Sequence, residues 1–153
     1  MNIRQYEDND IPRLIQMRFD FTAETKEIDP ALFEPFRQEC IQFFQEIQDS
    51  ERWHIWVAEV EGEVVSHVFV QMIDTVPRPG RVKSPWAYVT NVYTVPAYRA
   101  QGIGGAVMDE VNKWAKETGI TFLLVWPSET SAAFYARYGF ERAEEAMANH
   151  LGQ

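Results

Sequence analysis

The chain has 153 residues, 46% of them hydrophobic and 24% charged, a composition typical of one globular domain and not of a disordered segment. It carries 14 Lys plus Arg against 23 Asp plus Glu. The resulting net charge of −9 argues against a nucleic-acid-binding protein, which needs Lys and Arg to neutralise phosphates. The longest apolar run, residues 122–126, is far shorter than the roughly 20 residues that a membrane-spanning helix needs.

The single cysteine, Cys40, excludes an intrachain disulfide and argues against a cysteine-based zinc site. The N-terminus has no apolar stretch behind a basic start, so the sequence predicts no secretion signal. We therefore expect a cytoplasmic protein of one domain, residues 1–153, with no metal and with neither a nucleic acid nor a membrane as partner.

The first half of the chain predicts a short strand followed by two helices. Residues 3–6 form the strand, and apolar residues at helical spacing predict helices over about 11–24 and 35–49. The second helix carries a stripe of aromatic residues. Such a stripe could line a ligand pocket, but packing into the core is the more frequent use.

The second half predicts mainly strands, then a helix–strand–helix sequence. Glu61–Gly62 is a hairpin signal between two strand-like runs, and Gly119 and Gly139 are typical helix ends. The predicted strands are 53–60, 64–73, 86–95 and 121–126, the predicted helices are 103–118 and 131–138, and the tail, 141–151, adds one or two weak strands. This order indicates a layered α/β (α+β) domain with a mixed, mostly antiparallel sheet flanked by helices.

Charge is unevenly distributed along the chain. No Asp or Glu occurs between Asp74 and Asp109, and this stretch has a charge of +4 while the rest of the chain has −13. The gap is either chance or a local field that holds a polyanionic ligand.

A strand, a glycine-containing turn and a helix start lie inside this stretch, over residues 91–105. The unpaired backbone N–H groups of such a helix start attract phosphate, and Gly102 and Gly104 allow close approach. The Gly-Lys-Ser/Thr triplet of a nucleotide-binding P-loop is absent. A dinucleotide fingerprint is also excluded, because Val107 stands where it needs a small residue.

Two motifs resemble the GNAT-type N-acetyltransferase family. Arg99, Gly102 and Gly104 match its pyrophosphate loop, and residues 133–140, Ala-Phe-Tyr-Ala-Arg-Tyr-Gly-Phe, look like its late Phe-Tyr-x-x-x-Gly-Phe helix. The order of elements resembles the family over the whole chain. The run Asn91-x-Tyr93-Thr94-x-Pro96 looks like that of a bacterial group within the family.

The resemblance implies the acyl-CoA N-acyltransferase (GNAT) fold, acetyl-CoA as co-substrate, and a role for each matching residue. Tyr135 would donate a proton to the departing thiolate as the catalytic acid. Ser128 stands where the family often has an Asn that contacts the pantetheine. The backbone of Tyr93, Thr94 and Val95 would run beside the pantetheine, and the pyrophosphate would be held by Arg99, Ala100, Gln101, Gly102, Ile103, Gly104 and Gly105.

The general base is left open by the sequence. Many family members carry a Glu on the strand before the phosphate loop, but strand 86–95 has no carboxylate and offers Tyr88 and Thr90 instead. A water chain or an amine of low pKa would also serve. His67 is better explained as a core histidine that shares a face with Val65 and Phe69. The carboxylate candidates are Glu24, Glu27, Asp29, Glu59 and Asp74.

The leading hypothesis is therefore an enzyme that transfers acetyl from acetyl-CoA to a primary amine by direct attack. The alternatives are a catalytically silent acyl-CoA-binding module or sensor and an α/β interaction domain without coenzyme. The acceptor, a small-molecule or peptide amine, would be chosen by about residues 20–37 and 74–86, and the acidity outside the coenzyme region favours a cationic one. The aromatic excess and the tail predict a homodimer.

Overall fold

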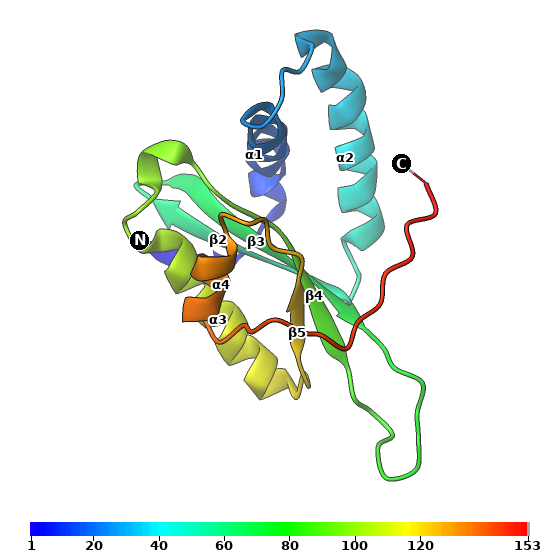
Figure 1. Cartoon of the computed structure of the whole chain (residues 1–153). Helices are drawn as coiled ribbons and strands as arrows, with labels where there is room; N and C mark the ends of the chain where they lie inside the picture. The colour runs from blue at the N-terminus through cyan, green and yellow to red at the C-terminus, as the bar shows by residue number, and fades with distance from the viewer. Residues whose placement is uncertain (153) are drawn as a thin grey trace.

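A computed structural model describes residues 1–152 as a five-stranded sheet with two helices on each face (Figure 1). The strands follow one another across the sheet in the order of the sequence. Neighbours β1 to β4 are antiparallel, and β5 runs parallel to β4, so the predicted mixed, mostly antiparallel sheet is confirmed. The elements are β1 (Asn2–Gln5), α1 (Ile11–Ala23), α2 (Phe33–Ile47), β2 (Trp53–Val60), β3 (Glu63–Ile73), β4 (Trp86–Thr94), α3 (Ile103–Thr118), β5 (Leu123–Val125) and α4 (Ala132–Arg137), with short 3₁₀ turns at Asp8–Asp10, Pro30–Leu32 and Pro96–Tyr98.

Each face of the sheet buries its own apolar cluster. Alternate side chains of β2, β3 and β4 point to opposite faces, so each strand contributes to both clusters. One cluster lies under α1 and α2 and includes Leu14, Met17 and Phe44. The other lies under α3 and α4 and includes Val107, Met108 and Tyr135. Among residues 1–152, none of the helices combines the length and apolar character that crossing a bilayer requires.

The turn signals of the sequence are confirmed. Glu61 and Gly62 have φ of 51° and 83°, the left-handed pair that a two-residue hairpin between β2 and β3 needs. Gly119, with φ of 77°, ends α3, and Gly139, with φ of 89°, follows α4. Both ends therefore require a conformation that glycine adopts without strain.

The predicted tail strands are wrong. Residues 141–152 contain no strand and make no backbone hydrogen bond within the described part of the chain, and Met147 is 99% exposed. The segment has no β-branched or aromatic residue, and it buries no face against the sheet. Two other elements are shorter than predicted, since β5 covers only residues 123–125 and α4 only 132–137.

Close packing of α4 on the start of α3 depends on Gly105. A Cβ added to Gly105 would overlap the hydroxyl of Tyr138 and lie 2.6 Å from its ring carbon Cζ. Gly105 is buried and Tyr138 is half-buried, so a Cβ at Gly105 would force the Tyr138 side chain away from α3. The absence of a side chain at this position therefore lets the two helices approach each other.

We predict that Gly105→Ala destabilises the protein by about 1–3 kcal/mol, because overpacking outweighs the roughly 1 kcal/mol that Ala gains over Gly in a helix. Adding Tyr138→Phe should recover part of the loss, since it removes the overlapping oxygen. Gly104→Ala is the control, because its Cβ would meet the rotatable Thr94 Oγ1 at 3.1 Å. Denaturant unfolding measures all three, and a Gly105→Ala protein as stable as the parent would contradict the prediction.

Candidate functional site

The turn before α3 presents a row of unpaired backbone donors. None of the six N–H groups of residues 100–105 donates a hydrogen bond within residues 1–152. Ala100 and Gly102 both have left-handed backbones, with φ of 59° and 79°, and such a kinked turn forms an anion-binding concavity at a helix N-terminus. The geometry therefore suits a phosphate group, as the sequence predicts.

Helix α4 packs beside this turn. A Cβ at Gly104 would lie 3.1 Å from Thr94 Oγ1 and 3.9 Å from the ring of Phe134. The two motifs that lie about 30 residues apart in the sequence are therefore neighbours in the structure, with the end of β4 between them.

Arg99 lies in an ion pair with the end of helix α1. Its Nη2 is 2.8 Å from each carboxylate oxygen of Glu24, its Nε donates to the carbonyl of Thr94 at 2.8 Å, and its guanidinium lies 5.3 Å from the ring centre of Tyr93. The Tyr93 hydroxyl also donates to Glu24, at 2.7 Å. A phosphate contact of Arg99 stays a prediction, and in this structure its partner is a carboxylate.

This cluster shifts two pKa values. Burial raises the pKa of Glu24, but hydrogen bonds from Tyr93 and Arg99 lower it more, so that it lies below its usual value. Burial and the neighbouring Glu24 raise the pKa of Tyr93 to about 12. Glu24 is therefore ionised and already bound, which makes it a weak candidate for the general base.

The second half of β4 has one unpaired edge. Strand β5 pairs only with residues 87–89 of β4, whereas β3 pairs with β4 as far as Thr94 (Figure 1). The Tyr93 carbonyl accepts from Ser66 of β3, the Val95 N–H donates to Val65, and the Val95 carbonyl accepts from Tyr98. Since backbone direction alternates along a strand, Thr94 is the one of the three predicted pantetheine contacts whose backbone faces the open edge.

A kink at Asn91 shapes this open edge. Asn91 has a φ of 47°, and the pairing of β3 with β4 shifts register opposite it. His67 Nδ1 hydrogen-bonds the Asn91 carbonyl at 2.8 Å, on the side of the sheet covered by α1 and α2. A left-handed backbone at a non-glycine residue is uncommon and needs support of this kind.

His67 is a core histidine, as predicted, but its neighbours differ in part. It is fully buried against Phe69 and Tyr93, while Val65 points to the opposite face because the register of β2 and β3 shifts at Ala58. Burial lowers the pKa of His67 to about 4, so the ring is neutral, and its Nε2 has no partner in residues 1–152. A fully buried ring of such low pKa is a poor general base.

Tyr135 lies on α4, is 7% exposed as a residue, and packs its ring between Phe134 and Phe140. Burial, and secondarily Tyr88 on β4, raise the pKa of Tyr135 to about 12. The hydroxyl is therefore protonated at neutral pH and makes no hydrogen bond within residues 1–152. A thiol has a reference pKa of about 8.5, and the reference pKa of a tyrosine is about 10. The raised pKa of Tyr135 therefore makes complete proton transfer from its hydroxyl to a thiolate less favourable than these reference values suggest, whereas donation of a hydrogen bond to the thiolate is easier.

Most of the remaining candidates are engaged locally, whereas Glu27 is exposed and makes no hydrogen bond or ion pair within residues 1–152. The Ser128 hydroxyl is exposed and hydrogen-bonds Ser131 at 2.9 Å, so it forms part of the turn before α4. Glu59 is paired with Arg4 at 2.8 Å and Asp74 with Arg52 at 2.7 Å, and Asp29 accepts from the Ala31 N–H. Within residues 1–152 no three His, Cys, Asp or Glu side chains are grouped so as to hold a metal.

Comparison with known proteins identifies relatives at the level of the family and the fold. A family model described as the acetyltransferase (GNAT) family matches residues 16–140. No curated protein sequence matches the chain.

Three solved structures illustrate the likeness of fold. A predicted acetyltransferase from Clostridium acetobutylicum, crystallised with acetyl-CoA, is 24% identical with a TM-score of 0.78, over 98% of this chain and 96% of that one. A transcriptional regulator from Bacillus halodurans is 23% identical with a TM-score of 0.78, over 97% of this chain and 98% of that one. Glucosamine-6-phosphate N-acetyltransferase from Arabidopsis thaliana is 18% identical with a TM-score of 0.75, over 99% of this chain and 98% of that one.

We predict that Glu24→Gln makes the protein less stable at neutral pH by about 0.5–1 kcal/mol, because a partly exposed ion pair contributes little more. The pKa of Glu24 is lowered in the folded state, so its stabilisation is complete above the unfolded value of 4.5 and is lost as the pH falls through and below it. The difference between variant and parent should therefore shrink in acid. Denaturant unfolding at neutral pH and at a pH below 4.5 measures the free energy of unfolding of variant and parent, with Glu27→Gln as control. A difference in that free energy that is the same at the two pH values would contradict the prediction.

Proposed function

Because the chain belongs to the acetyltransferase (GNAT) family, we propose that it transfers an acetyl group from acetyl-CoA to a primary amine of a small molecule or peptide. The coenzyme supplies the acetyl group as a thioester. The observation that carries the proposal is the row of six unpaired N–H groups in residues 100–105, inside a stretch without any acidic residue. This turn would hold the pyrophosphate.

The residues next to the turn fit the rest of the coenzyme. The open edge of β4 offers the N–H of Thr94 to an extended chain, in the manner of an added strand, whereas the Thr94 carbonyl accepts from Arg99. Tyr93 and Val95 flank this position, and Ser128 adds a hydroxyl at the start of α4. Arg99 stands beside the turn with its charge compensated by Glu24, and we assign it to the pyrophosphate once that ion pair opens.

In the reaction the amine nitrogen bonds to the acetyl carbon while the carbon–sulfur bond breaks, the amine loses a proton and the sulfur gains one. We assign the proton donation to Tyr135, whose hydroxyl is protonated and has no internal partner. Positioning of the two substrates supplies much of the catalysis in such a direct transfer.

Among the described residues, the structure singles out no acceptor for the amine proton. Strand β4 carries no carboxylate, and Glu24, Glu59 and Asp74 are ion-paired. Asp29 accepts from the Ala31 N–H, and Glu27 is exposed to solvent without a hydrogen bond or ion pair within residues 1–152. We therefore propose that water takes the proton, or that the acceptor is an amine that is already largely neutral at physiological pH.

Four further features belong to the proposal. They are a single domain, a place in the cytoplasm, membership of the bacterial group with the Asn91-x-Tyr93-Thr94-x-Pro96 strand, and a homodimer. Light scattering at working concentration tests the homodimer, which a monomer would contradict.

Titration with acetyl-CoA, followed by thiol-release assays on an amine panel, tests the proposed activity. Binding with amine-dependent thiol release supports it. Binding without release for any amine would instead favour the binding module, and no binding would overturn both.

We predict that Gly104→Glu weakens acetyl-CoA binding at least about 100-fold, which is about 2.7 kcal/mol, because a carboxylate would lie in the first turn of α3. A Cβ there would meet the rotatable Thr94 hydroxyl at 3.1 Å and the Phe134 ring at an ordinary contact distance of 3.9 Å, so the fold should persist. Isothermal titration measures the affinity, and Gln45→Glu on α2 is the control of equal charge. Unchanged affinity for acetyl-CoA in a folded Gly104→Glu protein would contradict the assignment of this turn to the pyrophosphate.

We predict that Tyr135→Phe lowers turnover by roughly 10²- to 10⁴-fold, the usual contribution of a positioned general acid. Coenzyme affinity and thermal stability should change little, because the ring stays in place. The control is Tyr138→Phe, the same change one turn later, which should leave turnover within about threefold. If Tyr135→Phe also stays within threefold, water is the acid and Tyr135 has a packing role only.

A further inference from the structure

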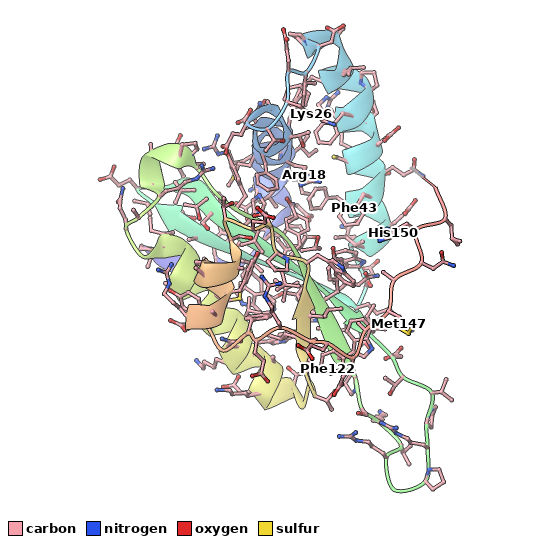
Figure 2. The ribbon with its side chains drawn as sticks, viewed as in Figure 1. Arg18, Lys26, Phe43, Phe122, Met147 and His150 are labelled. Atoms are coloured by element: carbon pink, nitrogen blue, oxygen red, sulfur yellow. The ribbon has the colours of Figure 1, made fainter. Side chains whose placement is uncertain are left out.

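A hollow of about 230 Å³ lies between α1, α2 and the sheet. Its wall is almost wholly apolar, and Figure 2 shows Phe43 of α2 beside the space between the two helices. Ligand pockets span about 300–1,000 Å³, so this one suits a single large side chain and not a whole drug-sized molecule. The apolar lining comes from Leu14, Ile15, Phe36, Phe43, Phe44 and Phe69.

One cation stands at this hollow. Arg18 lines it from α1 and is exposed to solvent (Figure 2). Within residues 1–152 its side chain makes one hydrogen bond, a long one of 3.3 Å to the neutral Oδ1 of Asn91, and no carboxylate lies at ion-pair distance. Its guanidinium also lies 5.5 Å from the ring centre of Phe21. Most of its donors are therefore free for a ligand, unlike those of Arg99, which Glu24 occupies.

The cation also lies next to the proposed site of transfer. Thr90 and Asn91 of β4 line the same hollow, and Asn91 is the kinked residue at the open edge where we place the pantetheine arm. A carboxylate bound to Arg18 would thus lie beside that edge, with any apolar group attached to it directed into the hollow.

We propose that this hollow selects the acceptor, and that the acceptor is an α-amino acid with a large apolar side chain, its side chain among the aromatic residues and its carboxylate on Arg18. The inference rests on the proposed function, which leaves the acceptor open. It differs from the cationic acceptor that the overall acidity favours, because the local charge at the hollow is positive.

An α-amine also suits a site without a carboxylate base. It is one carbon away from the carboxylate, so binding to Arg18 brings it to the open edge of β4. The amine of a free α-amino acid has a pKa above the roughly 7.7–8.0 of a peptide N-terminus, because its own carboxylate stabilises the ammonium form, but below the roughly 10.4 of a lysine amine. Binding of that carboxylate to Arg18 weakens this stabilisation, so a larger fraction of the amine is neutral than for a lysine amine. The transfer then forms the amide nitrogen–carbon bond and breaks the thioester carbon–sulfur bond, the amine proton going to water and the sulfur receiving its proton from Tyr135.

Binding of an analogue that lacks the amine tests the hollow without any turnover. We expect 3-phenylpropanoate to bind at least about tenfold more tightly than 3-phenylpropan-1-ol or 3-phenylpropan-1-amine, and Arg18→Gln to reduce that preference to within twofold. Arg37→Gln on α2 is the control of equal charge, because Arg37 pairs with Glu34 and does not line the hollow. The analogue should also slow alkylation of Cys40, the only cysteine, which lines the hollow.

The opposite results would overturn the inference. They are no binding of the carboxylate, equal binding of the alcohol or the amine, or a carboxylate preference that survives Arg18→Gln. Because this titration contains no coenzyme, its failure leaves acetyl-CoA binding and thiol release with other amines intact. Failure of those assays would sink the proposed function but not the binding result.

Turnover provides the second arm. We expect kcat/KM for phenylalanine to exceed that for phenylalanine amide and for 2-phenylethylamine by at least about tenfold, and the preference to vanish in Arg18→Gln. A protein that acetylates all three amines equally well, or that prefers the amine without a carboxylate, would contradict the assignment.

Discussion

The incomplete pairing of β4 is the constraint on which the rest of the site depends. Three residues of β5 cover the first half of β4, and beyond them the strand has a partner on one side only. An unpaired edge inside a sheet leaves backbone donors and acceptors that another extended chain can satisfy. The kink at Asn91, supported by the buried ring of His67, lies within this unpaired stretch.

Helices α3 and α4 frame that edge through close packing and not through charge. Gly105 lets the Tyr138 side chain sit against α3, and the ring of Phe134 lies against Gly104. The same short helix carries Tyr135. The turn that exposes six backbone N–H groups and the tyrosine assigned as acid are therefore held in fixed relation by one interface, as a preorganised site requires.

The contact of Glu24 with Arg99 and Tyr93 connects the two sides of the sheet. Glu24 follows the last residue of α1, next to the segments that would choose an acceptor, whereas Arg99 precedes the glycine-containing turn before α3. Arg18, one and a half turns earlier on α1, reaches Asn91 of β4. Helix α1 and the residue after it thus contact β4 at Asn91 and at Tyr93, and the hollow lined by Arg18 and Asn91 lies at the first of these contacts.

The sequence by itself determined most of the elements, the hairpin at Glu61–Gly62, the glycine-containing turn before α3 and the mixed sheet, because each depends on local periodicity or on a backbone angle that one residue type prefers. Only the tertiary structure decided which side chains meet. The ion pair of Arg99 with Glu24 joins residues 75 positions apart, and the register shift that separates Val65 from His67 is invisible to simple alternation. The prediction of strands in residues 141–152 failed for the same reason. A strand forms only where it can pair with a neighbouring edge and bury one face, and the sequence of the segment does not show whether either is available.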